Sequence, residues 1–250
     1  MRRRFFVERF TPDGAALEGP AAHHLARVLR AEPGQLYELS DGQSVCLARV
    51  ERIGRDSVNF AVVERVAVPV PRLDPTLLIA VVKFDRFEWA LEKATELGVG
   101  AIVPLAASRS DKGLLAAAPK RAARWKKILL ESAQQARCLR PPVLHSLTRP
   151  RQAFAAQDSA IRILLSEQAG APQLRNVLEE KVRNSGTLPP APLRISLAIG
   201  PEGGWTEDEL AAAEAAHFSP ASLGGNILRT ETAVVAALAG AHLCLARDQD

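Results

Sequence analysis

Two short glycine-containing turns in the C-terminal half of the chain are the first candidates for chemistry. One is the GPEGG sequence of residues 200–204, which follows an apolar run that ends at Ile199. Thr206 and Glu209 have the spacing of a capping box, so a helix is predicted to begin directly after this turn. Glycines at the carboxyl end of a parallel strand leave backbone amides unshielded, so that a ligand can approach closely. An ordinary strand-to-helix turn, in which the glycines serve only turn geometry, explains the spacing equally well.

The second turn, residues 222–229, precedes a strongly apolar helix. Thr230 suits the cap of that helix, and Glu231 suits its positive end. Capping does not explain why Asn226 and Arg229 flank so apolar a turn. A residue pair of this kind could line a ligand site.

Other familiar signatures are absent from the sequence. No G-x-G-x-x-G opens a first strand–helix unit, and there is no G-x-x-x-x-G-K-[ST], so a Rossmann dehydrogenase and a P-loop ATPase are disfavoured. No G-x-S-x-G elbow is present. The adjacent His23 and His24 cannot point the same way on a helix, and Cys46, Cys138 and Cys244 lie far apart. We therefore expect no metal site and three reduced, mostly buried thiols.

Composition limits the classes of protein further. With 250 residues, 47% of them hydrophobic, the chain can form a large packed core. Its longest apolar runs fall well short of the roughly 20 residues that span a bilayer. The N-terminal MRRR sequence resembles the start of a signal peptide, but Glu8 and Arg9 interrupt the apolar stretch that should follow. A cytoplasmic protein without a membrane segment is expected.

Charge gives a weaker indication of the partner. The net charge is only +4, but residues 73–140 carry an excess of basic over acidic side chains. Many of them fall on a predicted helix at residues 119–138. A basic helix is usually a solvated face, so this pattern by itself favours nucleic acid only weakly.

Three prolines in residues 69–75 mark the clearest boundary, since they disfavour both a helix and a central strand and indicate a stiff connector. Short β-rich runs and one helix precede it, and they predict a small β-barrel of about 70 residues. The predicted strands are 4–7, 35–39, 44–53 and 57–66, and the predicted helix is 20–30.

After the connector, buried-looking strands alternate with helical periods, which is typical of a parallel sheet in an α/β domain. The predicted strands are 77–82, 101–105, 143–147, 161–165 and 193–199. The predicted helices are 87–97, 119–138, 173–182, 206–216 and 230–246.

At the two turns the chain also resembles a known family. GPEGG after an apolar strand, followed by LG-x-x-ILRTETA at residues 223–233, is similar to the RsmE family of SPOUT-superfamily methyltransferases. Residues 23–30 resemble the N-terminal helix of that family. Residues 83–99, with Pro104 and Arg109, resemble its central block. Each motif is weak alone, but the ordered set is specific.

The resemblance implies a PUA-like, RNA-binding β-barrel at residues 1–72. It further implies a SPOUT-type α/β domain with a parallel sheet and a deep trefoil knot at residues 73–250, and an obligate homodimer. The implied activity is methylation of N3 of one uridine in small-subunit (16S) ribosomal RNA, with S-adenosylmethionine as the donor. The residues alone leave two alternatives open: an RNA-binding factor without catalysis, and an α/β enzyme that acts on a small nucleotide.

The resemblance also implies roles for particular residues. The cofactor site would consist of Glu167, Ile199, Gly200, Pro201, Glu202, Gly203, Gly204, Leu223, Gly224, Ile227 and Leu228. Uridine N3 must lose a weakly acidic proton, so a general base or a stabilising cation is needed. Arg229 is the candidate for stabilisation and Glu231 the candidate base. Glu202 is an alternative base, and a role for Glu231 as a helix-end acid is the simpler explanation.

RNA contact is expected from the first domain and from the basic part of the second, and it should weaken steeply with salt. The candidate residues are Arg2, Arg3, Arg4, His24, Arg27, Arg30 and Arg109. Gln134 and Cys138 depart from the family pattern. So does the pair Gly225 and Asn226, which stands where the family has Pro-Arg. If that arginine contacts RNA or a partner subunit in the family, this chain either lacks the contact or makes it with another residue.

Overall fold

The structure is a computed structural model that describes residues 3–12, 14–68, 71–168, 170–184 and 192–245. It divides into two compact units. Residues 1–69 and 133–141 form the first, and residues 70–132 and 142–250 form the second. The segment 133–141 is therefore distant in sequence from the unit to which it belongs. The domain boundary between residues 72 and 73 stays a prediction.

The first unit contains one five-stranded sheet in the order β1-β3-β4-β5-β2. Its strands are β1 (Arg4–Phe6), β2 (Ala15–Glu18), β3 (Leu36–Ser40), β4 (Val45–Ile53) and β5 (Ser57–Val66). The β1–β3 pair is parallel and the other pairs are antiparallel. Four of these strands lie within a residue or two of their predicted ranges, and β2 was missed. In the described residues β1 and β2 do not pair, so the sheet keeps two edges.

Aromatic and aliphatic side chains fill the core of this unit. Phe5, Leu39 and Phe60 are fully or almost fully buried. The ring of Tyr37 packs edge-on against Phe5 and against Phe60. The predicted helix at residues 20–30 is present as α1 (Gly19–His23) followed by the π-helix η1 (His24–Val28). This helical segment buries Leu25 in the same core.

The segment 133–141 completes the first unit through hydrogen bonds to its sheet. Arg4, which is only 7% exposed, forms an ion pair with Glu38 (Nη2–Oε2, 3.0 Å). The same guanidinium donates to the carbonyl oxygen of Cys138 at 3.2 Å. The Ser40 hydroxyl donates to the carbonyl oxygen of Leu139 at 2.6 Å. Burial raises the pKa of the Cys138 thiol.

The second unit contains a six-stranded sheet in the order β11-β9-β10-β6-β7-β8. All its pairings are parallel, which confirms the predicted parallel sheet. The strands are β6 (Leu73–Ala80), β7 (Ala101–Leu105), β8 (Val143–Leu144), β9 (Ile161–Leu165), β10 (Leu193–Ile199) and β11 (Ser219–Ala221). The helices are α2 (Phe84–Glu96), α3 (Lys112–Gln135), α4 (Pro150–Ala155), α5 (Leu174–Asn184), α6 (Glu207–Ala215) and α7 (Thr230–Leu245). Strand β11 and helix α4 were missed.

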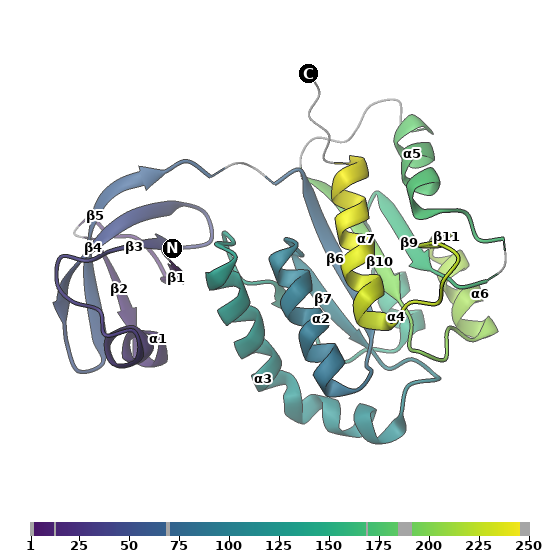
Figure 1. Cartoon of the computed structure of the whole chain (residues 1–250), viewed down its shortest axis with the longest axis horizontal. Coiled ribbons are helices and arrows are strands. Elements are labelled where there is room, and N and C mark those ends of the chain that lie inside the picture. The colour runs from purple at the N-terminus through teal and green to yellow at the C-terminus, as the bar shows by residue number, and fades with distance from the viewer. Residues whose placement is uncertain (1–2, 13, 69–70, 169, 185–191, 246–250) are drawn as a thin grey trace. The chain divides into compact units, whose positions relative to one another are not determined.

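Helices cover both faces of this sheet (Figure 1). Leu77 and Ile79 of β6 point into a core shared with α2, α3, α5 and α7. The alternate residues Leu78 and Ala80 point into a second core with α4 and α6. Side chains of a strand alternate between its faces, so one apolar strand contributes to both cores. In the described residues no helix is long and apolar enough to cross a membrane.

Two predictions involving proline were wrong. β6 is a central strand that includes Pro75, although the prolines disfavoured a strand there. The Pro75 carbonyl accepts from the Gly100 amide at 2.8 Å, and the ladder with β7 begins one residue later, at Thr76. A residue's N–H and C=O point to the same side of a strand. Proline has no N–H group, and at position 75 that group would point towards β7. Because the ladder with β7 begins only at Thr76, no hydrogen bond of the ladder is lost.

Helix α3 begins at Lys112 rather than at Pro119, which lies inside it. The Asp111 carboxylate accepts the Leu114 amide at 3.0 Å, so a capped first turn forms well before the proline. An interior proline removes one helical hydrogen bond and bends a helix, and α3 is bent (Figure 1). The trefoil knot stays a prediction.

Candidate functional site

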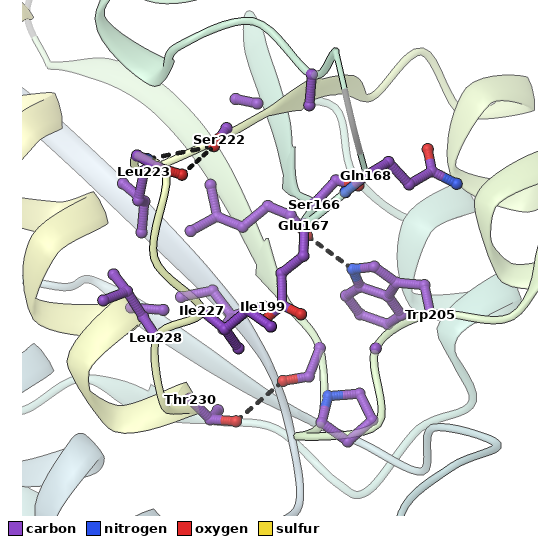
Figure 2. Close-up of a pocket in the computed structure, with 18 of the residues that line it drawn as sticks. Ser166, Glu167, Gln168, Ile199, Trp205, Ser222, Leu223, Ile227, Leu228 and Thr230 are labelled. Atoms are coloured by element: carbon purple, nitrogen blue, oxygen red, sulfur yellow. Dashed lines mark hydrogen bonds between the residues drawn. The ribbon is translucent and has the colours of Figure 1, made fainter.

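A cavity of about 730 Å³ lies at the carboxyl ends of three neighbouring strands of the second unit, β9, β10 and β11 (Figure 2). Its lining residues come mainly from the segments that follow these strands, at 165–168, 199–205 and 221–228. Ligands of parallel α/β sheets bind at this edge. The topology thus brings the two glycine turns of the sequence together in one cavity.

The geometry of the first turn requires its glycines. The Trp205 indole donates to the carbonyl oxygen of Leu165 at 2.9 Å, which fixes the ring beside the turn. A Cβ atom on Gly200 would lie 3.0 Å from Cε2 of that ring. Gly204 has a φ of +70°, and its amide donates to the carbonyl oxygen of Pro201 at 2.8 Å. The predicted capping box of Thr206 and Glu209 is confirmed directly after this turn.

The second turn is held by Ser222, whose hydroxyl accepts the Gly224 amide at 3.2 Å and donates to the Gly224 carbonyl at 3.0 Å. In the described residues the peptide groups of 225–228 make no hydrogen bond to protein. Leu223, Ile227 and Leu228 line one side of the cavity, across from Trp205 (Figure 2). The cavity therefore offers an apolar wall next to unpaired peptide groups.

Thr230 joins the two turns. It is the first residue of α7, and its hydroxyl donates to the carbonyl oxygen of Gly200 at 3.1 Å. The predicted role of Thr230 as a helix cap stays a prediction, and the observed bond adds a contact with the other turn. This bond couples the start of α7 to the end of β10.

The predicted cofactor residues gather at this cavity with one exception. Those that line it are Glu167, Ile199, Gly200, Pro201, Gly203, Gly204, Leu223, Gly224, Ile227 and Leu228. Glu202 does not line it and instead forms an ion pair with Arg86 of α2. In the described residues no group of three His, Cys, Asp or Glu side chains could hold a metal ion.

Similarity to known proteins follows the same division of the chain. Residues 69–242 match a family model described as an RNA methyltransferase domain, and residues 17–63 match an RNA methyltransferase PUA domain. Ribosomal RNA small subunit methyltransferase E from Mycobacterium bovis is 33% identical, over 97% of this chain and 92% of that protein. The protein of the same description from Synechocystis is 34% identical over 87% of this chain and 69% of that protein.

The chain belongs to the ribosomal RNA small subunit methyltransferase E family. A crystal structure of such a methyltransferase from Neisseria gonorrhoeae, bound to S-adenosylmethionine, has a TM-score of 0.81 and 28% identity, with 97% of this chain and 98% of that chain covered. A putative methyltransferase from Legionella pneumophila, also in complex with the cofactor, has a TM-score of 0.80 and 27% identity, with 97% and 98% covered. The first unit contains the PUA-like domain of this methyltransferase family, and the parallel sheet belongs to its methyltransferase domain.

The two residues predicted to be catalytic lie beside the cavity rather than in its lining. Arg229 is exposed, at the rim just before α7. The Glu231 side chain is 14% exposed, and its Oε1 lies 3.8 Å from Nε of Arg86. The other carboxylate oxygen of Glu231 is buried, and in the described residues it has no hydrogen-bond partner.

Arg86 is a residue of this methyltransferase that sequence reasoning missed. It contacts the carboxylates of both Glu202, which lies on the first glycine turn, and Glu231, which lies in the first turn of α7. Its only sequence signal was a place in the central block at residues 83–99, where nothing distinguished it from a surface arginine. A guanidinium that bridges two acids from separate segments helps to hold those segments together.

The predicted RNA-binding residues differ in exposure and in the unit to which they belong. Arg3, Arg27 and Arg30 are exposed, His24 is half-buried, and Arg2 lies outside the described residues. Arg4 is buried and uses its guanidinium within the first unit, so it is removed from our RNA-binding proposal. Arg109 belongs to the second unit and lines the cavity.

Proposed function

We propose that this chain transfers a methyl group from S-adenosylmethionine to N3 of a specific uridine in small-subunit (16S) ribosomal RNA. The observation that carries the proposal is the cavity at the ends of three parallel strands, lined by both glycine turns. The family to which the chain belongs supports the proposal. Relatives in this family are named for small-subunit ribosomal RNA, and the crystal structure of one contains bound S-adenosylmethionine.

The cavity fits the parts of the cofactor. Ile199, Leu223 and Leu228 supply apolar surface for an adenine ring. The peptide groups of residues 225–228, which make no hydrogen bond within the described part of the chain, can hydrogen-bond the polar edge of that ring. Glu167 offers a carboxylate for ribose hydroxyls or an ammonium group. When bound, the cofactor supplies an electrophilic methyl group on a sulfonium.

The residues of the chain have two tasks in this reaction. They must hold the acceptor nitrogen in line with the methyl carbon and the sulfur, which is a task of positioning. They must also take up the N3 proton or stabilise the resulting anion. Arg229, exposed at the rim, is our candidate for stabilising the anion. Glu231, positioned by Arg86, stays the candidate base, with Glu202 as the alternative.

For RNA binding we propose the exposed face of the first unit around residues 27–30. Arg27 and Arg30 can neutralise phosphates, and His24 lies in the same helical segment. Val28 and Leu29 are exposed between the two arginines, at 62% and 36%. Apolar side chains beside basic ones suit the bases and the phosphates of unpaired RNA. Arg3 extends the basic character of this unit.

We further propose that the protein acts as a homodimer in the cytoplasm, on the assembled or assembling small subunit. Support for a second copy comes from α2 and α7, which carry the exposed apolar side chains Trp89 (44%) and Leu243 (76%). A 2.9 Å hydrogen bond joins the His242 ring of α7 to the carbonyl of Leu97, the residue that follows α2. A second copy would remove this apolar surface from water.

Calorimetry and a methylation assay test the proposal together. The folded protein should bind S-adenosylmethionine with micromolar affinity, and Gly203→Val should abolish binding, because a Cβ atom there already lies 3.3 Å from the Arg109 side chain. Small-subunit ribosomal RNA from cells that lack the protein should gain one N3-methyluridine when the protein and cofactor are added, as measured by mass spectrometry. Folded protein that binds no cofactor would contradict the proposal.

The same measurements separate the two rival functions. A non-catalytic RNA-binding factor would show salt-sensitive RNA affinity and no cofactor affinity. An enzyme for small nucleotides would bind a nucleotide and show no affinity for RNA.

A further inference from the structure

Arg109 differs in charge from the other side chains that line the cavity. Among the lining residues that the structure describes, it alone has a basic side chain, whereas Glu167 and Glu207 are acidic. The remaining lining residues are neutral. A ligand with an anionic group therefore has one cationic partner in this cavity.

The protein holds the backbone of Arg109 from both sides. The Ser108 amide, one residue before it, donates to Oε1 of the buried Glu209 at 2.8 Å. The hydroxyl of Ser110, one residue after it, donates to the carbonyl oxygen of Val81 at 2.8 Å. Because these anchors lie on α6 and at the end of β6, the loop at residues 106–110 presents Arg109 at a fixed place.

The side chain of Arg109 is also ordered by the first glycine turn. Nη1 donates to the carbonyl oxygen of Gly203 at 2.7 Å. Its stem lies over Gly203, where an added Cβ atom would be 3.3 Å from Cβ and 3.4 Å from Cδ of Arg109. One of the five guanidinium N–H donors is thus used by the protein, which leaves others for a ligand. Such pre-ordering reduces the entropy lost on binding.

We propose that Arg109 binds the carboxylate of the methionine part of S-adenosylmethionine. The inference rests on the proposed function. The cofactor has a sulfonium, an ammonium and one carboxylate, so the carboxylate is its only anionic group. Glu167 and Glu207 would repel that group, whereas Arg109 attracts it through charge-assisted hydrogen bonds. Fixing this end of the cofactor also limits the directions in which its methyl group can point.

Two ligands that differ only in this carboxylate provide the test. We expect wild-type protein to bind S-adenosylmethionine about 10- to 100-fold more tightly than decarboxylated S-adenosylmethionine in calorimetry. Arg109→Gln should lose affinity for the complete cofactor by a similar factor while its affinity for the decarboxylated form is kept. The ratio of the two affinities then approaches one. Arg151→Gln, which changes an exposed arginine of α4, is the matched control and should keep the wild-type ratio.

Other outcomes would overturn the assignment. Equal losses for both ligands in Arg109→Gln would mean that the residue only maintains the shape of the cavity. Unchanged cofactor affinity together with weaker RNA binding would assign Arg109 to RNA instead. If wild-type protein binds both ligands equally, the proposed role of Arg109 is contradicted and the proposed function is not. If wild-type protein binds neither ligand, the proposed function is contradicted as well.

Discussion

The hydroxyl of Thr230 donates a 3.1 Å hydrogen bond to the carbonyl oxygen of Gly200, so the first turn of α7 is tied to the end of β10. Both residues line the cavity. Thr230 is almost fully buried, and Gly200 is half-buried. This bond, together with the Arg86 ion pairs, therefore contributes to the relative placement of the two glycine turns.

Thr230→Val removes this donor and leaves the Gly200 carbonyl without it. We expect a loss of about 1 kcal/mol in the free energy of unfolding, measured in urea, because one net intramolecular hydrogen bond is lost. Cofactor affinity should fall as well. Thr230→Ser keeps the hydroxyl and should retain most of both properties. A Thr230→Val protein with wild-type stability and affinity would show that the hydrogen bond contributes nothing, and a larger loss in Thr230→Ser than in Thr230→Val would assign the effect to the methyl group.

Gly200→Ala should disturb Trp205. The new Cβ atom would lie 3.0 Å from the indole ring, which is itself held by its bond to the Leu165 carbonyl. We expect a loss of about 1–3 kcal/mol of stability and changed tryptophan fluorescence. Gly225→Ala is the control for stability, since a Cβ atom there meets nothing within 4 Å. A stable Gly200→Ala protein with unchanged fluorescence would contradict this view of the turn.

Glu209 supports two features through one carboxylate. It accepts the Thr206 amide at 2.9 Å as the capping box of α6, and the Ser108 amide at 2.8 Å. Glu209→Ala should therefore lower the free energy of unfolding by about 2–3 kcal/mol. Asp208→Ala, which changes an exposed residue of the same first turn, should change it by less than about 0.5 kcal/mol. Similar losses in both variants would point to helix-end charge as the cause.

Local elements of this chain could be predicted well because each has a pattern of its own. The ranges of β5, β7, β9 and β10 match their predictions residue for residue, since runs of apolar and β-branched side chains mark them. The missed elements β11 and α4 are only 3 and 6 residues long, too short for a period to show. Pro75 misled the prediction because its fit depends on where the neighbouring strand begins, which is a property of the tertiary structure.

The residues of the candidate site also fall into those that local sequence predicts and those that depend on tertiary contacts. Residues on the two glycine turns could be predicted from local sequence and resemblance. Arg86 and the position of Arg109 could not, because each depends on contacts with residues far along the chain, such as Glu231 and Gly203. Arg4 and Arg3 are neighbours of the same type in sequence, and only packing separates a buried ion pair from a solvated side chain.

Arg4→Ala should destabilise the first unit without a specific effect on RNA. It leaves the Glu38 carboxylate, 14% exposed, without its main partner, and losing one member of a buried ion pair costs about 3–5 kcal/mol. Thermal unfolding should show this loss, whereas Arg3→Ala should unfold like wild type. Full stability of Arg4→Ala would argue that the ion pair contributes nothing net to the fold.

Arg27→Ala and Arg30→Ala should weaken RNA binding and leave stability unchanged, because both side chains are exposed. Each variant should also reduce the slope of log affinity against log salt by about 0.7–0.9, the effect of one lost phosphate contact. Titrations at several salt concentrations measure the slope. A slope equal to that of wild type would place the RNA elsewhere.

The membership of residues 133–141 in the first unit has a consequence for biosynthesis. A nascent chain that has released only its first 69 residues lacks the carbonyl groups that Arg4 and Ser40 hydrogen-bond. The N-terminal unit cannot reach its native state until more than half of the polypeptide has been translated and has cleared the ribosomal exit tunnel. The part of the protein that is synthesised first therefore has to wait for a segment that interrupts the sequence of the second unit.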